Sequence, residues 1–198
     1  MDRLNWNQLP NVITSLRLLL LVPLAFYLTV QDYRMSLLIF FVAGVSDALD
    51  GFLAKRYNWV SRFGSILDPI ADKALLVLTM ALLTANQKIS LVLFVLVALR
   101  DIYIVLGAYI FYKKIGPFNM QPSLISKLNT FVQILLVAAI LVSLGYRALP
   151  QLAIQVFTYS VYFTVIASAI HYTLVWGRKF KLELQKQNSQ SSQSDSNQ

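Results

Sequence analysis

The sequence contains no cysteine, a single histidine and few charged residues for its length. The lack of cysteine excludes disulfide and thiolate chemistry, and His171 alone is too little for a histidine metal site. Only 13% of the 198 residues are charged, against about a quarter in soluble domains, and 57% are hydrophobic. With a mean hydropathy of +0.61, the composition excludes an ordinary soluble core and favours an integral membrane protein.

The positive charge of the chain is placed as in a membrane protein. The net charge is +8, but most basic residues flank apolar runs, so we expect no nucleic-acid binding. The first apolar run follows the polar residues 1–11 and is too long for a signal-peptide core, so we expect no cleavable signal.

Apolar segments long enough to cross a bilayer follow one another along the chain, each of about 20 residues. They predict an all-α integral membrane protein, a six-transmembrane-helix bundle that forms one membrane domain over residues 1–180. The remaining residues, 181–198, are rich in Gln and Ser and predict a disordered polar tail. The predicted spans are 12–30, 34–56, 65–85, 89–112, 124–145 and 151–176.

The basic residues in the connections, in the tail and at the ends of the spans predict the orientation, because Lys and Arg collect on the cytoplasmic side of membrane proteins. One side would hold eleven of them and the other only three, so we expect both termini in the cytoplasm. The eleven are Arg3, Lys55, Arg56, Arg62, Lys113, Lys114, Lys127, Arg178, Lys179, Lys181 and Lys186, and the three are Arg34, Lys88 and Arg147.

Carboxylates inside the predicted spans are the unusual feature of this sequence. The chain has nine acidic residues, and five of them, Asp47, Asp50, Asp68, Asp72 and Asp101, lie in spans. An intramembrane carboxylate is costly unless it faces a cavity or a partner. The first pair has i, i+3 spacing near the cytoplasmic end of one helix, and the second has i, i+4 spacing near the cytoplasmic start of the next. We therefore expect four carboxylates to meet just inside the cytoplasmic face.

Four carboxylates this close require cations, and all-oxygen ligands suit Mg²⁺, Mn²⁺ or Ca²⁺. Small residues beside them, Gly51, Ala54 and Gly64, leave room for a bulky ligand, and Lys55 at the rim can hold phosphate oxygens. Together these features suggest a phosphorylated, lipid-linked substrate. A single intramembrane Asp is often a structural or proton-relay residue, and a cation transporter that uses the carboxylates as its ion site is the alternative of another class.

The spacing of these residues resembles the signature of the CDP-alcohol phosphatidyltransferases, D-x2-D-G-x2-A-R-x8-G-x3-D-x3-D. The chain matches it from Asp47 to Asp72, with Lys55 in place of the family's Arg, which keeps the charge but loses the planar fork. The resemblance covers nearly the whole chain. The opening L-P-N-V-I-T-x-x-R resembles the phosphatidylglycerophosphate synthase and cardiolipin synthase branch. Arg100-Asp101, the run from Pro122 to Gln133 and the segment 167–179 resemble cardiolipin synthases of the CMP-forming, eukaryotic type.

The resemblance implies a reaction and roles for particular residues. CDP-diacylglycerol and phosphatidylglycerol would give cardiolipin and CMP, and phosphatidylglycerophosphate synthesis from glycerol 3-phosphate is the nearest alternative. Mg²⁺ or Mn²⁺ would be the cofactor and Asp72 the base for the acceptor hydroxyl. The family also implies a homodimer. The metal ligands would be Asp47, Asp50, Asp68 and Asp72, and the residues for CDP-diacylglycerol would be Gly51, Ala54, Lys55, Gly64, Asn11 and Thr14.

Two basic residues on later helices are the candidates for binding the acceptor phosphate. Arg100 lies inside the fourth predicted span and Lys127 at the start of the fifth. A structural pair between Arg100 and an aspartate, and an interfacial role for Lys127, are the alternatives. Asn129 stands where the glycerol 3-phosphate branch has a second lysine, which suits a monoanionic lipid acceptor. We expect an enzyme of the bacterial inner (cytoplasmic) membrane, with the active site facing the cytoplasm and membrane lipids as its partners.

Overall fold

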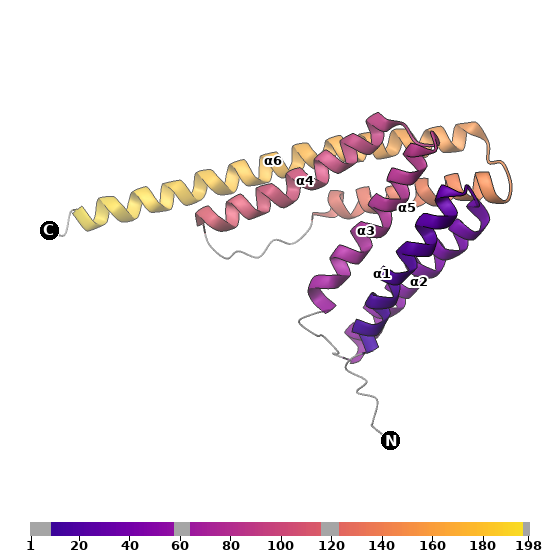
Figure 1. The fold of residues 1–198 in the computed structure, drawn as a ribbon. Helices are drawn as coiled ribbons and strands as arrows, with labels where there is room; N and C mark the ends of the chain where they lie inside the picture. The colour runs from indigo at the N-terminus through magenta and orange to yellow at the C-terminus, as the bar shows by residue number, and fades with distance from the viewer. Residues whose placement is uncertain (1–8, 58–63, 116–122, 196–198) are drawn as a thin grey trace, which may run out of the picture.

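The computed structural model describes residues 9–57, 64–115 and 123–195, with side chains described for 15–47, 49, 71–110, 113 and 123–175. The described residues form six α-helices and no strand, as the sequence predicts (Figure 1). The first five helices begin and end within about three residues of the predicted spans. The helices are α1 (Leu9–Thr29), α2 (Tyr33–Tyr57), α3 (Gly64–Ala85), α4 (Leu91–Ile115), α5 (Leu124–Gly145) and α6 (Gln151–Asp195).

Three segments within the described residues are long and apolar enough to cross a membrane. They are Leu91–Ile110, Leu124–Gly145 and Gln151–Val175, and Ser15–Thr29 is a shorter apolar segment. The second and third helices contain the aspartates and several basic residues, which lower their mean hydropathy. The prediction of a helical membrane protein therefore agrees with the fold, whereas six spans and cytoplasmic termini stay predictions.

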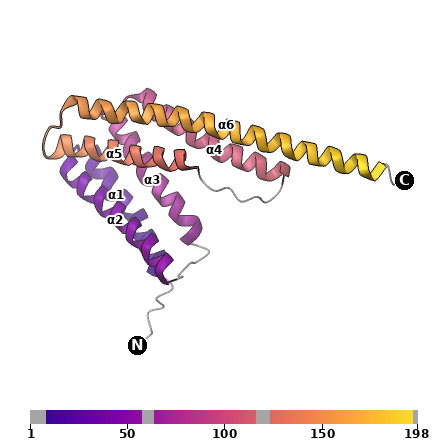
Figure 2. The ribbon, with the colours of Figure 1, turned by 180° about the vertical axis from the view of Figure 1, so that it is seen from behind.

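The helices pack into two connected groups (Figures 1 and 2). In the first, α1 contacts α2 and α3; in the second, α6 contacts α4 and α5. The third helix joins the groups because it also contacts α4 and α5, and α2 contacts α5. A continuous apolar core fills the space between them, with fully or almost fully buried residues from all six helices: Leu24, Leu28, Ala43, Met80, Leu83, Leu93, Leu136, Val137, Leu141 and Val161.

Two of the connections repeat one turn geometry. Gln31, after α1, and Gln87, after α3, both have a φ of 60°, in the left-handed region. In each turn an amide reaches back five residues, from Asp32 to the carbonyl of Tyr27 and from Lys88 to that of Leu83. These bonds satisfy carbonyls at the helix ends in the Schellman manner. The chain can therefore reverse after α1 and α3 with few connecting residues.

The start of α2 and the end of α5 meet closely at the same end of the molecule as these turns. A Cβ added at Gly145 would lie 3.0 Å from the backbone nitrogen of Arg34 and from the carbonyl carbon of Tyr33. The Arg34 side chain donates to the Gly145 carbonyl at 2.6 Å and lies over the ring of Tyr146, 5.7 Å from its centroid. Glycine is therefore required here by a close approach of two helices.

The last helix is longer than the span predicted for it. The sequence predicts a disordered tail over 181–198, whereas in the structure α6 runs on through Asp195 (Figure 1). Residues 177–195 contain one glycine, Gly177, and no proline, so no strong helix breaker follows the apolar part. A division into a membrane domain and a tail stays a prediction.

Candidate functional site

An arginine and two aspartates from three helices meet within the first helix group. Nη1 of Arg17, in α1, lies 2.8 Å from Oδ1 of Asp47 in α2 and 2.5 Å from Oδ1 of Asp72 in α3. The Arg17 side chain is 1% exposed, whereas each aspartate side chain is 45% exposed. One buried cation thus holds two carboxylates whose other sides remain accessible.

The topology explains why these three residues meet. Arg17 lies in the first half of α1, Asp47 in the second half of α2 and Asp72 in the first half of α3. Consecutive helices run in opposite directions (Figure 1), so all three positions fall at about the same level along the group. The sequence-based expectation that Asp47 and Asp72 reach the same depth agrees with this geometry.

Arg17 is the residue of this cluster to which the sequence analysis assigned no role. The signal was present, since Arg17 is the only charged residue in the apolar run 12–30. A charged residue inside a span requires a partner, and the aspartates of the next two helices were the available ones. Buried cations and intramembrane carboxylates should therefore be considered together.

The other residues predicted for the metal and CDP-diacylglycerol sites lie on described helices, but their side chains lie outside the described set. Asp50 follows Asp47 by one turn of α2, and Asp68 precedes Asp72 by one turn of α3. The remaining residues of this kind are Asn11 and Thr14 on α1, Gly51, Ala54 and Lys55 on α2, and Gly64 at the first position of α3. Their roles stay predictions.

The donor set at this site fits a divalent cation of the Mg²⁺ type. Asp47 and Asp72 offer hard carboxylate oxygens at one place, which is the ligand chemistry such ions prefer. Among the residues with described side chains, no group of three or more Asp, Glu, His or Cys gathers around a common point. Asp50 and Asp68, which carry the rest of the predicted ligand set, are outside that search.

Arg100 occupies a different place from the aspartate pair. Its guanidinium is buried and bonds to Asp101 at 2.7 Å, to the Ser126 hydroxyl at 2.6 Å and to the Ser168 hydroxyl at 2.5 Å. These contacts tie α4 to α5 and α6, which matches the structural pairing that the sequence left open as an alternative. Lys127 is exposed in the first turn of α5. A role for either residue in binding the acceptor stays a prediction.

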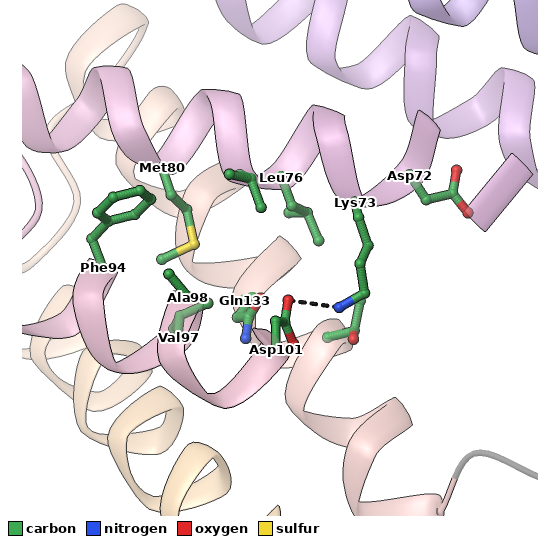
Figure 3. Close-up of a pocket in the computed structure, with 11 residues that line it drawn as sticks. Asp72, Lys73, Leu76, Met80, Phe94, Val97, Ala98, Asp101 and Gln133 are labelled. Carbon is green, nitrogen blue, oxygen red and sulfur yellow. Dashed lines mark ion pairs between the residues drawn. The ribbon is translucent and has the colours of Figure 1, made fainter. Parts of the chain in front are cut away.

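A narrow pocket of about 50 Å³ begins at Asp72 and runs between α3, α4 and α5 (Figure 3). Its polar end holds Asp72, Lys73 and Asp101, and the Lys73 ammonium lies 2.6 Å from the Asp101 carboxylate. The rest of the wall is mostly apolar, with Leu76, Val77, Met80, Phe94, Val97 and Ala98 beside Thr130 and Gln133. Asp72 thus belongs both to the carboxylate pair and to the pocket.

Comparison with known proteins identifies the family of this chain. A family model described as CDP-alcohol phosphatidyltransferase matches residues 7–173. Proteins named cardiolipin synthase (CMP-forming) from Rattus norvegicus and Homo sapiens are both 32% identical over 187 residues, which cover 86% of this chain and 62% of each relative. The chain therefore spans less than two thirds of the length of these relatives.

Relatives with another printed activity also match. A protein of Aquifex aeolicus, named CDP-diacylglycerol–glycerol-3-phosphate 3-phosphatidyltransferase, is 30% identical over 138 residues, which cover 69% of this chain and 74% of that protein. Relatives with two different printed activities therefore match this chain.

Proposed function

The chain belongs to the CDP-alcohol phosphatidyltransferase family, and we propose that it transfers the phosphatidyl group of CDP-diacylglycerol to phosphatidylglycerol, giving cardiolipin and CMP. The observation that carries this proposal is the position of Asp72. Its carboxylate pairs with Arg17, which also holds Asp47, and the residue itself lies at the end of a largely apolar pocket. A base in that position serves a lipid hydroxyl that comes from the membrane.

In the proposed reaction Asp72 accepts the proton of an acceptor hydroxyl. The hydroxyl oxygen attacks the phosphorus that carries diacylglycerol, a new P–O bond forms, and the P–O bond to the CMP phosphate breaks. Arg17 keeps Oδ1 of Asp72 and Oδ1 of Asp47 oriented toward one another through a shared guanidinium nitrogen. Because Arg17 is buried and pairs with an aspartate on each of α2 and α3, it fixes the relative positions of the two carboxylates.

A divalent ion fits the proposal as cofactor. Asp47 and Asp72, with Asp50 and Asp68 one helical turn away, would hold Mg²⁺ or Mn²⁺. When bound, the ion supplies positive charge to the diphosphate of CDP-diacylglycerol and to the departing CMP.

The donor nucleotide would lie on the α2 side of the carboxylates. The resemblance assigns it the small residues of α2 and α3 together with Lys55, which would bind phosphate oxygens, and Asn11 and Thr14 would border the same site. Arg100 and Lys127 remain the predicted contacts of the acceptor phosphate. A homodimer in the bacterial inner membrane, with the site facing the cytoplasm, completes the proposal.

Synthesis of phosphatidylglycerophosphate from glycerol 3-phosphate is the second candidate, because relatives with that printed name match the chain. A lipid acceptor is favoured by the apolar pocket at Asp72 and by the relatives named cardiolipin synthase, which match more of this chain. A cation transporter is disfavoured, because the family model covers residues 7–173 and its description is that of a transferase.

Purified chain with Mn²⁺ and labelled CDP-diacylglycerol tests the proposal when each acceptor is added in turn. We expect CMP and cardiolipin with phosphatidylglycerol and little product with glycerol 3-phosphate. Phosphatidylglycerophosphate without cardiolipin would assign the second candidate. If no acceptor releases CMP, the chain is not a phosphatidyltransferase under these conditions and the proposal is wrong.

A further inference from the structure

The pocket between α3, α4 and α5 is polar at one end and apolar along the rest. On α3 its wall runs from Asp72 to Met80, eight residues or about 12 Å of helix. On α4, which runs in the opposite direction, the wall begins deep at Phe94 and ends at Asp101 beside Lys73 (Figure 3). The charged groups therefore gather at one end and the apolar side chains extend away from them.

The shape and chemistry of this slot match one part of a glycerophospholipid. A volume of about 50 Å³ exceeds the roughly 10–15 Å³ that a cavity needs to hold one water, yet it is far too small for a whole lipid. Val77 and Lys73 in its wall are exposed, so the slot is accessible from the side. An acyl chain could enter laterally with its ester group near the polar end.

Gln133 supplies an independent observation that points to a ligand. Its side chain is 4% exposed and lines the slot about one helical turn beyond Thr130. Its amide nitrogen Nε2 is buried and has no hydrogen-bond partner among the residues with described side chains. Buried donors are almost always satisfied, and an unsatisfied one in an apolar wall destabilises the fold. An ester carbonyl of a lipid in the slot would accept this hydrogen bond.

The position of the slot favours the acceptor lipid over the donor lipid. Among the residues with described side chains, the slot is lined by α3, α4 and α5 and not by α2, whereas the residues that the family resemblance gives to the nucleotide lie on α1, α2 and the start of α3. Asp72, the proposed base, lies at the polar end. A lipid bound here presents its headgroup hydroxyl to Asp72 and its phosphodiester to Lys73, in competition with Asp101.

From these observations we infer that the α3–α4–α5 slot binds the acceptor phospholipid, with its ester carbonyl on Gln133 and the start of one acyl chain between Leu76, Met80 and Val97. This assignment rests on the proposed function, since it names the place where the acceptor is held. Gln133 becomes a specificity residue for a diacyl acceptor, because glycerol 3-phosphate has neither the ester nor the chain.

Two pairs of variants test the slot by kinetics. Gln133→Leu removes the buried donor and Ala98→Leu fills the slot, with Gln155→Leu and Ala85→Leu as matched controls at exposed positions outside it. We expect Gln133→Leu to raise the KM for phosphatidylglycerol about five- to tenfold, the range of one lost hydrogen bond. Ala98→Leu leaves less room for the acyl chain and should raise the same KM, and the controls should leave it unchanged. The KM for CDP-diacylglycerol should stay within about twofold in all four, because the donor does not use this hydrogen bond. An equal rise in both KM values, or none, would contradict the inference.

Photolabelling tests the same slot without turnover. Wild-type chain is labelled with phosphatidylglycerol that carries a diazirine on its acyl chain close to the ester, in the absence of CDP-diacylglycerol. We expect adducts on α3 and α4 residues of the slot, loss of these adducts in Gln133→Leu and Ala98→Leu, and little competition by phosphatidylcholine or by CDP-diacylglycerol. Adducts elsewhere, or displacement by CDP-diacylglycerol, would overturn the assignment. Failure of wild-type chain to make cardiolipin would overturn the proposed function, and the labelling does not depend on that result.

Discussion

Replacing Asp72 by Asn exchanges one carboxylate oxygen for an amide nitrogen, and this tests the proposed chemistry with little change to the fold. The amide has the shape of the carboxylate, and its carbonyl oxygen can still accept from Nη1 of Arg17, which lies 2.5 Å from Oδ1 of Asp72. It cannot take a proton from an acceptor hydroxyl. We therefore expect the binding of CDP-diacylglycerol to survive better than turnover.

The expected magnitudes differ enough to be measured apart. Loss of general-base assistance typically lowers turnover about 10²–10⁴-fold, or about 3–5 kcal/mol in the activation barrier. The cost to folding should be below about 1 kcal/mol, since the Asp72 side chain is 45% exposed and solvent screens its pairing with Arg17. Arg17 also keeps its second partner, Asp47, at 2.8 Å.

The assay is CMP release from CDP-diacylglycerol and phosphatidylglycerol, together with the thermal unfolding midpoint of the same preparations. Asp32→Asn is the matched control. Asp32 precedes α2 and its carboxylate accepts from the Met35 amide at 3.1 Å, a role that Asn fills equally well. We expect the control to keep both properties. Wild-type turnover by Asp72→Asn, or a turnover loss matched by unfolding, would refute the reasoning.

Four further predictions follow from the same site and fold. Chelation of divalent ions should abolish CMP release, and Mn²⁺ or Mg²⁺ should restore it. Arg17→Lys should lower turnover strongly and the unfolding midpoint only slightly, because the lysine nitrogen is one bond closer to the backbone than Nη1 and cannot reach both Asp47 and Asp72 from α1. A turnover loss explained by unfolding would contradict this. Lys55→Ala should raise the concentration of CDP-diacylglycerol needed for half-maximal rate, while Lys55→Arg should be tolerated. Gly145→Ala should reduce stability by about 1–3 kcal/mol, since its Cβ would meet backbone atoms at 3.0 Å, and denaturant unfolding checks this.

The helices were predictable from the sequence because long apolar runs separated by turn residues are a strong signal. Helix bounds agree closely where a sharp signal ends the run, as with Gly145 at the end of α5. The end of α6 was not predictable in this way, because its polar residues weaken the apolar signal without breaking the helix. The turns lie in the gaps that the predicted spans leave at 31–33 and 86–88. Their left-handed residues, Gln31 and Gln87, are neither glycine nor asparagine, so the sequence does not predict this geometry.

In the candidate site, the proximity of Asp47 and Asp72 was predictable, whereas their basic partner was not. Two aspartates on each of two adjacent helices fix a common depth, and Asp47 and Asp72 do lie together. Spacing alone could not tell which basic residue faces them, since Arg17 and Arg100 both lie inside apolar runs. In the fold, Arg17 contacts the carboxylate pair, whereas Arg100 contacts Asp101 and the hydroxyls of two serines. The buried, unpaired amide of Gln133 results from the packing of three helices, so no local sequence pattern predicts it.

The fate of one phosphorus atom tests the central claim most directly. CDP-diacylglycerol is prepared with radioactive phosphorus only in the phosphate next to diacylglycerol and is given to purified chain with Mn²⁺ and unlabelled phosphatidylglycerol. Transfer of the phosphatidyl group to the lipid hydroxyl predicts radioactive cardiolipin and unlabelled CMP in equal amounts. Radioactivity that remains in the nucleotide product, or that leaves as phosphatidic acid with no cardiolipin formed, would contradict the account.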